Sequence, residues 1–343
     1  MESVSLTMNV ESRSGYNRVI ELVRSAIYED IFAMAKVCDL PLTSYPFSEI
    51  IPSLKQLLDQ AAYLWNRKEI DPQLKIRTAP DDSSAPPVNR PLRIGIYPVA
   101  ANPFHWAHML AGLSALVRFR LDKVVYLISG SDPRKPSMIS AEIRHFMGKE
   151  VLKMFAPLFG YSSSAMGSND DGETNMFKML ALNPEQRIDA FYIVGADHYH
   201  RIHPKTGAAD TIQKIEEHLA RNTGDFNDAL HSVSIIFIER GARHHVVETC
   251  LPMAFIPEMP FAASSTIIRE AFQGKHGIEA LALMPYAAYR CAVELGLYNT
   301  KYSPLTHHRQ HNQLAPHTRR LHWRDARVPC SMLRKYRVCQ SVE

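Results

Sequence analysis

Cysteine is scarce in this sequence, and its arrangement excludes two classes of small cross-linked fold. The five cysteines are scattered over 343 residues, are odd in number and show no CxxC spacing. A secreted disulfide framework or a zinc ribbon needs closely and regularly spaced cysteines. The chain is therefore expected to work in a reducing, intracellular compartment.

Long apolar runs and a strong charge of one sign are also missing. No uninterrupted apolar stretch approaches the roughly 20 residues that span a bilayer, and the first residues, MESVSLTMNVESRSGYNRV, contain no apolar signal core. The formal net charge of +4 is small for this length, so it indicates neither a nucleic-acid nor a membrane partner. These absences predict a soluble, cytoplasmic globular protein.

The first part of the chain, residues 1–76, is expected to be helical. Apolar residues recur at three- and four-residue spacing over 16–38 and 50–66, which is the period of an amphipathic helix. Residues 77–91 are rich in Pro, Ser and Asp and cannot bury a core. We therefore expect a linker at 77–91 that separates an N-terminal helical region from a second domain.

Residues 92–300 alternate between strand-like and helix-like segments. Short β-branched, apolar runs occupy 92–97, 123–128, 188–194 and 233–238, and the spacing at 106–119 and 141–155 predicts helices. Such runs separated by helices are typical of a parallel sheet covered on both faces. The predicted fold class is α/β, with a doubly wound parallel sheet.

The last segment, residues 301–343, is basic and has no hydrophobic periodicity. It contains five histidines, many arginines and almost no acid. Two interpretations are open: a basic arm for a polyanion, or a solvated, poorly ordered tail. We expect the second, and therefore no nucleic-acid partner.

Two histidines directly follow the first strand of the α/β region. His105 and His108 lie one turn apart, in the first turn of the predicted helix, where free backbone N–H groups and the helix dipole attract anions. Two imidazoles there can donate hydrogen bonds to a polyphosphate. Taken alone, an HxxH pair also fits a surface helix face or a loose metal signal without an evident third ligand.

A second candidate element lies far along the chain, at 261–269. Ser264 and Ser265 are candidate N-cap residues for a helix beginning near Thr266, and Arg269 follows one turn later. Hydroxyls, N–H groups and a planar guanidinium at one helix start suit phosphate oxygens, such as those of a leaving pyrophosphate. Without other evidence, the same pattern is simply a capped helix.

Together the two elements resemble the nucleotidyltransferase superfamily. Its G-x-F/Y-x5-P-x-H-x-G-H loop is similar to residues 95–108 (GIYPVAANPFHWAH), and its I-S-S/T-T-x-x-R segment is similar to 263–269 (ASSTIIR). Within that superfamily, the nicotinate or nicotinamide mononucleotide adenylyltransferases are the most similar, because three segments between the two elements also match. The resemblance covers residues 92–300 and implies a Rossmann-like fold.

The resemblance also implies roles for individual residues. His105, His108 and Arg269 would be catalytic. The ATP-binding residues would be Gly195 and Asp197, in a segment like the family's G-A-D motif, together with Ser264, Ser265 and Thr266. The acceptor and its phosphate would be bound by Asn102, by Lys135 and Arg144 in a segment like P-x-K…R, and by Arg240 in one like the family's strand ending in Arg and Gly. No protein metal ligand is expected.

The loop before the histidines departs from the family pattern. Pro98-Val-Ala-Ala101 stands where the family has Gly-Gly-Thr/Ser-Phe, and Ala107 replaces the Gly between the histidines. Loss of the glycines restricts the backbone, and Pro98 removes an N–H donor. The acceptor side of the site is therefore less well matched than the ATP side.

The implied activity is transfer of AMP from ATP, with Mg²⁺, to nicotinate or nicotinamide mononucleotide, releasing pyrophosphate for NAD biosynthesis. The choice between the two acceptors stays open. A sister transferase using a phosphopantetheine-type acceptor or CTP, and a non-catalytic nucleotide-binding protein, are the alternatives. The N-terminal helices carry no evident chemistry, and a role for them in a homo-oligomer also stays open.

Overall fold

A computed structural model describes residues 3–83, 88–130, 138–221, 227, 229–239, 247–257, 261 and 263–299, with side chains from residue 15 to residue 298. Its centre is a sheet of six parallel strands in the order β3-β2-β1-β4-β5-β6. The strands are β1 (Leu92–Val99), β2 (Lys123–Ile128), β3 (Phe159–Ser162), β4 (Ile188–Gly195), β5 (His231–Ile238) and β6 (Met253–Ile256).

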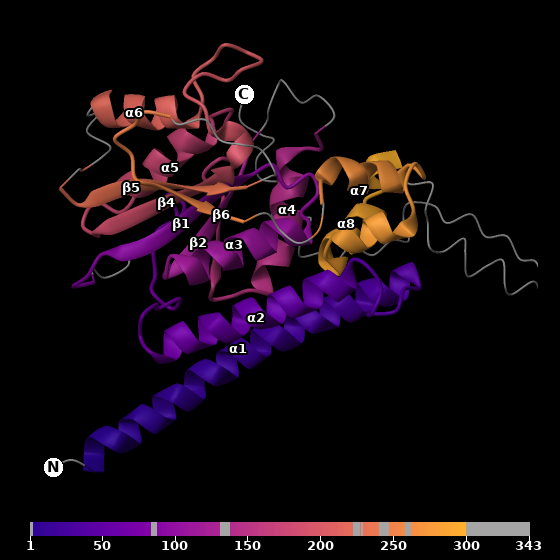
Figure 1. The fold of residues 1–343 in the computed structure, drawn as a ribbon, viewed down its shortest axis with the longest axis horizontal. Coiled ribbons are helices and arrows are strands. Elements are labelled where there is room, and N and C mark those ends of the chain that lie inside the picture. Colours follow the sequence, from indigo (N-terminus) through magenta and orange to yellow (C-terminus); the bar gives the residue numbers. More distant parts are fainter. Residues whose placement is uncertain are drawn as a thin grey trace, which may run out of the picture. The chain divides into compact units, whose positions relative to one another are not determined.

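Helices cover both faces of the sheet, which confirms the doubly wound α/β prediction (Figure 1). Along β1, Leu92, Ile94 and Ile96 join the core cluster on the side of α5 and α6, while Tyr97 and Val99 join the cluster on the side of α3. The helices are α3 (Trp106–Arg118), α4 (Ala141–Lys153), α5 (Gly172–Ala181), α6 (Thr211–Arg221), α7 (Ser265–Phe272) and α8 (Tyr286–Glu294), with short 3-10 turns η1 (Ala196–His198), η2 (Ile278–Leu283) and η3 (Leu297–Asn299).

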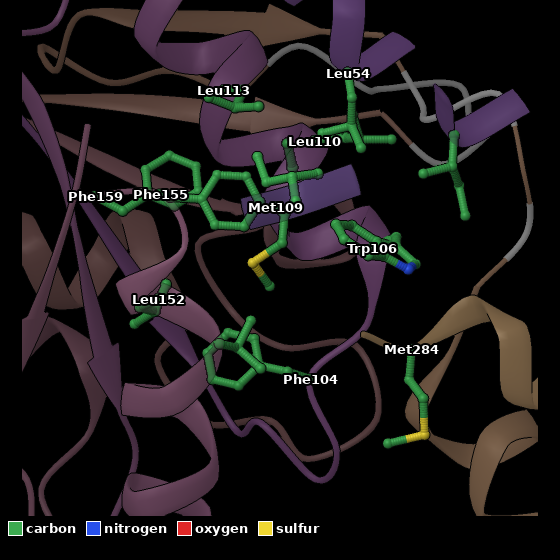
Figure 2. Packing of buried hydrophobic residues seen from close by; sticks show 14 of the residues in the cluster. Leu54, Phe104, Trp106, Met109, Leu110, Leu113, Leu152, Phe155, Phe159 and Met284 are labelled. Atoms are coloured by element: carbon green, nitrogen blue, oxygen red, sulfur yellow. The ribbon is translucent and has the colours of Figure 1, made fainter. Parts of the chain in front are cut away.

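Two long helices precede the sheet, α1 (Ser3–Cys38) and α2 (Phe47–Asn66). The buried face of α2, including Leu54 and Leu58, belongs to the same hydrophobic cluster as Trp106 and Leu110 of α3 (Figure 2). Residues 1–302 accordingly form one compact unit. The expected linker therefore does not divide two separately packed cores, because the apolar face of α2 is buried against α3.

The described part of the segment between α2 and β1 is also held in place. Asp71 donates its backbone N–H to Asp122 (2.7 Å), and Thr78 donates its hydroxyl to the Tyr161 carbonyl (3.1 Å). Arg77 exchanges hydrogen bonds with Asn183, which is 7% exposed. The described start of the predicted linker, at Arg77 and Thr78, is thus hydrogen-bonded to the α/β region.

No helix among the described residues is long and apolar enough to cross a membrane. The basic segment beyond residue 302 lies outside the described residues, so the expectation of a poorly ordered tail stays a prediction.

A buried carboxylate of α1 caps the first turn of α8. Asp30 is 7% exposed and accepts hydrogen bonds from the backbone N–H groups of Tyr286 (2.7 Å) and Ala287 (2.8 Å). A negative charge at a helix N-terminus is favourable, but burial penalises that charge. Burial outweighs the two hydrogen bonds here and raises the pKa of Asp30 from 3.8 to about 6.

This shift predicts a pH dependence of stability. Because the folded state holds the Asp30 proton more tightly than the unfolded state, the contribution of Asp30 is present below pH 4 and is lost as the pH rises through 6. The loss amounts to about 3 kcal/mol. Chemical denaturation between pH 4 and 7 should therefore show a flatter profile for Asp30→Asn than for the wild type. Glu29→Gln, a matched change at an exposed neighbour, should follow the wild type; parallel profiles for all three proteins would contradict the assignment.

Candidate active site

The histidine pair lies where β1 ends and α3 begins. His105 is the N-cap of α3, with extended backbone (φ −142°, ψ 161°), so the helix starts at Trp106. The rings of His105 and His108 are stacked with their centroids 3.6 Å apart. The backbone N–H of His105 donates to Nδ1 of His108 (3.3 Å), so the neutral His108 ring carries its proton on Nε2.

Packing beneath the pair fixes the start of α3. Trp106 is fully buried in the cluster that contains Leu54 of α2 and Met284 (Figure 2), so it packs in the core. On the sheet side, the buried hydroxyl of Tyr126 donates to the carbonyl of His108 (2.9 Å). Gly112 leaves room for that hydroxyl, because a Cβ there would lie 2.2 Å from it. The histidines thus stand on a rigid support.

The distant helix α7 contacts the same loop. Ser264 is its N-cap, as predicted, and accepts a hydrogen bond from the N–H of Ile267 (3.2 Å). Ser265 donates its hydroxyl to the carbonyl of Pro103 (2.8 Å), and Arg269 donates through Nη1 to the carbonyl of Asn102 (2.7 Å). Segments more than 160 residues apart in sequence therefore meet immediately before the histidine pair.

Gly195 is the last residue of β4, the strand beside β1, and Asp197 lies in the turn η1 that follows it. The strand order reverses between these two strands, and ligands of open α/β sheets bind at the carboxyl ends of strands at such a point. The Asp197 side chain is 57% exposed, and its carboxylate lies 3.8 Å from Nε2 of His198. His198 is hydrogen-bonded through Nδ1 to Asp210 (3.0 Å), which raises the pKa of His198. The loops after β1 and β4 thus flank one end of the sheet.

No model of a known protein family matches the chain. Three curated proteins are similar to it. The probable nicotinate-nucleotide adenylyltransferase of Clostridium botulinum is 25% identical over 56% of this chain and 92% of that protein, and the one of Maridesulfovibrio salexigens is 26% identical over 60% of this chain and 96% of that protein. The nicotinate-nucleotide adenylyltransferase of Bacillus subtilis is 24% identical over 61% of this chain and 99% of that protein. Over 56–61% of its length, the chain is thus similar to the nicotinate-nucleotide adenylyltransferases.

Solved structures are also similar. Plasmodium falciparum nicotinic acid mononucleotide adenylyltransferase complexed with NaAD is 14% identical, with a TM-score of 0.45, and the same enzyme complexed with APC is 13% identical, with a TM-score of 0.41. Each match covers 61% of this chain and 98% of the Plasmodium chain.

Arg144, which was expected to bind a phosphate, lies in the interior of the molecule. The side chain is fully buried, and its guanidinium donates to the carbonyls of Ala100 (2.8 Å), Ser129 (2.7 Å) and Ile139 (3.0 Å), as well as to that of Gly130. A guanidinium so enclosed cannot meet a ligand at the surface without leaving these carbonyls. We therefore assign Arg144 to holding together the ends of β1 and β2. Lys135 and Arg240 lie outside the described residues.

The histidines beyond the pair do not form a metal site in the part of the chain that is described. No group of three or more His, Cys, Asp or Glu side chains is placed there to hold a metal ion. His198 is instead hydrogen-bonded to Asp210, whereas His244 and His245 lie outside the described residues.

The departure from the family loop has a conformational counterpart at Ala101. This residue is 1% exposed and adopts a left-handed backbone conformation (φ 52°). Side chains other than Gly disfavour that region by about 1 kcal/mol. Ala101 thus holds a backbone conformation that favours glycine, although the glycines of the family pattern correspond to Pro98 and Val99.

We expect Ala101→Gly to raise the free energy of unfolding by up to about 1 kcal/mol, because the strain is removed. Ala100→Gly is the matched control: Ala100 has no positive φ, so glycine there should cost about 0.5–1 kcal/mol. Urea denaturation measures both changes. A loss of stability in Ala101→Gly as large as that in Ala100→Gly would contradict the strain argument.

Proposed function

We propose that this protein transfers AMP from Mg·ATP to nicotinate mononucleotide or nicotinamide mononucleotide and releases pyrophosphate. One observation carries the proposal. The loop that ends in His105 and His108 is bonded directly to the helix that carries Arg269, at the carboxyl ends of the central strands. Such an arrangement would present imidazole, guanidinium and helix N-terminal donors to a polyphosphate bound at this end of the sheet.

The reaction proposed for this site needs no protein nucleophile. An oxygen of the acceptor phosphate attacks the α-phosphorus of ATP, the bond from that phosphorus to the bridging oxygen breaks, and pyrophosphate leaves with the electron pair. Catalysis then rests on positioning and on stabilising the charge that develops on the phosphate oxygens.

His108 is proposed as the principal donor to that charge. Its Nδ1 accepts the His105 N–H, so the Nε2–H is the group that would donate to a phosphate oxygen. The Tyr126 hydroxyl on the His108 carbonyl limits movement of this residue. Such a preorganised donor costs little reorganisation when the charge develops.

Asp197 is proposed to bind the ribose of ATP, because its exposed carboxylate can accept hydrogen bonds from two hydroxyls. Magnesium would arrive on the triphosphate, whose oxygens are the ligands it prefers. Arg269 would meet the β- and γ-phosphates and stabilise the leaving pyrophosphate.

The nicotinate form is proposed as the preferred acceptor, because the three relatives bear that name. The test incubates purified full-length protein with Mg²⁺ and ATP, adds each mononucleotide in turn and measures pyrophosphate. We expect release that depends on the acceptor and is faster with nicotinate mononucleotide. Equal, acceptor-independent release, or none, would contradict the proposal; phosphopantetheine and CTP arms test the sister activities.

A further inference from the structure

A tyrosine from the end of the described chain reaches the loop in front of the histidine pair. Tyr298 lies in η3 and adopts a left-handed backbone conformation (φ 63°, ψ 22°). A bulky residue seldom takes this conformation, and such outliers persist where the surrounding structure holds them. The ring of Tyr298 packs against that of Phe272 of α7, with centroids 5.5 Å apart. The ring contact places the Tyr298 side chain beside α7.

The hydroxyl of Tyr298 donates to Oδ1 of Asn102 (3.2 Å). Burial raises the pKa of Tyr298, so the hydroxyl keeps its proton at neutral pH and must be the donor. The amide of Asn102 is thereby oriented: its oxygen faces Tyr298, and its Nδ2 group points elsewhere. Among the described residues, none accepts a hydrogen bond from that Nδ2.

The backbone around Asn102 is held by two side chains of α7. Its carbonyl accepts the hydrogen bond from Arg269 (2.7 Å), and the next carbonyl, of Pro103, accepts from Ser265 (2.8 Å). Asn102 is only 6% exposed. The side chain and the backbone of Asn102 are thus both fixed by residues that come after the last strand in sequence. Asn102 itself lies three residues before His105.

We propose that Tyr298 is a positioning residue that orients the amide of Asn102, so that its Nδ2 donates to the phosphate of the acceptor mononucleotide. The inference rests on the proposed function and deepens it, because it assigns a donor to the acceptor side of the site. There the loop lacks the hydroxyl and glycines of the family pattern, and an amide N–H can take the place of such a donor.

The test compares Tyr298→Phe with Tyr289→Phe. Tyr289 packs on the same Phe272 ring, 5.9 Å between centroids, and has no bond to the loop, so its variant removes a hydroxyl from the same aromatic cluster. We expect Tyr298→Phe to weaken binding of nicotinate mononucleotide, measured by calorimetry, and to lower kcat/KM for that acceptor about tenfold, the effect of one lost hydrogen bond. The KM for ATP should stay within about twofold, and Tyr289→Phe should behave as the wild type.

Asn102→Ala supplies the second half of the test. If Tyr298 acts through Asn102, adding Tyr298→Phe to Asn102→Ala should change kcat/KM less than about twofold. Additive losses, an equal loss in Tyr289→Phe, or unchanged acceptor binding in Tyr298→Phe would overturn the inference.

Should Tyr298→Phe fail to fold, the variant Asn102→Asp tests the inference instead. It keeps an oxygen that accepts from Tyr298 but has no Nδ2, so normal acceptor binding in this variant would overturn the inference. A wild type that binds the acceptor but releases no pyrophosphate would contradict the proposed function alone.

Discussion

Replacing His108 by alanine should lower kcat roughly 100-fold or more while leaving the protein folded. Removal of one preorganised donor to a developing oxyanion typically costs about 2.7–4 kcal/mol of transition-state stabilisation. The His108 ring is half-buried and meets the rings of Tyr97 (6.3 Å between centroids) and Phe104 (5.6 Å) only edge-on, so its loss should lower the free energy of unfolding modestly. Turnover is measured as acceptor-dependent pyrophosphate release, and folding by thermal denaturation of the same samples.

The matched control is His276→Ala. The His276 ring is half-exposed and is bonded to Glu270 (3.0 Å), outside the site, so its loss should leave kcat unchanged. His108→Gln adds a graded test, because a glutamine amide can place an N–H near the position of the imidazole Nε2–H and should recover part of the lost rate. Near-normal turnover in a folded His108→Ala protein would contradict the assignment of His108 as a donor.

The long, strongly patterned elements of the fold were predictable from sequence. The β-branched runs that became β1, β2, β4 and β5 lie in the middle of the sheet, where burial on both faces demands apolar residues throughout. The two edge strands, β3 and β6, were not predicted. Each has only four residues, and its extended conformation depends on pairing with β2 or β5, which no local pattern encodes.

The site was predictable in part for a similar reason. His105, His108 and Arg269 stand in motifs whose order along the chain indicated one site, and the contacts of Arg269 and Ser265 with the β1 loop show that these segments meet. The environment of Arg144 was not predictable, because a basic residue near a loop has the same sequence pattern whether it faces a phosphate or four carbonyls. Tyr298 acquires its partner, Asn102, only through the tertiary fold.

Replacing Asp122 by alanine should lower the free energy of unfolding by about 3 kcal/mol or more. Asp122 is 1% exposed, and its two carboxylate oxygens accept four hydrogen bonds: two from Arg90 (2.6 and 2.8 Å), one from the N–H of Asp71 (2.7 Å) and one from the N–H of Arg93 (3.0 Å). Loss of one partner from a buried, hydrogen-bonded ion pair commonly costs about 3–5 kcal/mol. Arg90 is 41% exposed and can be rehydrated, which places the expected loss at the lower end.

Asp59→Ala is the control for Asp122→Ala, because Asp59 forms an ion pair of similar length with Arg24 (2.5 Å) but is 52% exposed. Exposed pairs contribute about 0–1 kcal/mol, so urea denaturation should separate the two variants clearly. Equal losses would contradict the role of Asp122.

Asp122 and His108 also lie toward opposite ends of β1, and this separates their expected effects. Asp122 binds the start of β1 at Arg93 and joins it to Asp71 after α2, whereas the histidine pair follows the end of β1. At a temperature where Asp122→Ala is still folded, its kcat should therefore equal that of the wild type. His108→Ala should show the reverse: a free energy of unfolding close to that of the wild type, with little turnover. A large fall in kcat for folded Asp122→Ala would instead show that a change at the contact between β1 and the segment after α2 alters the site through β1.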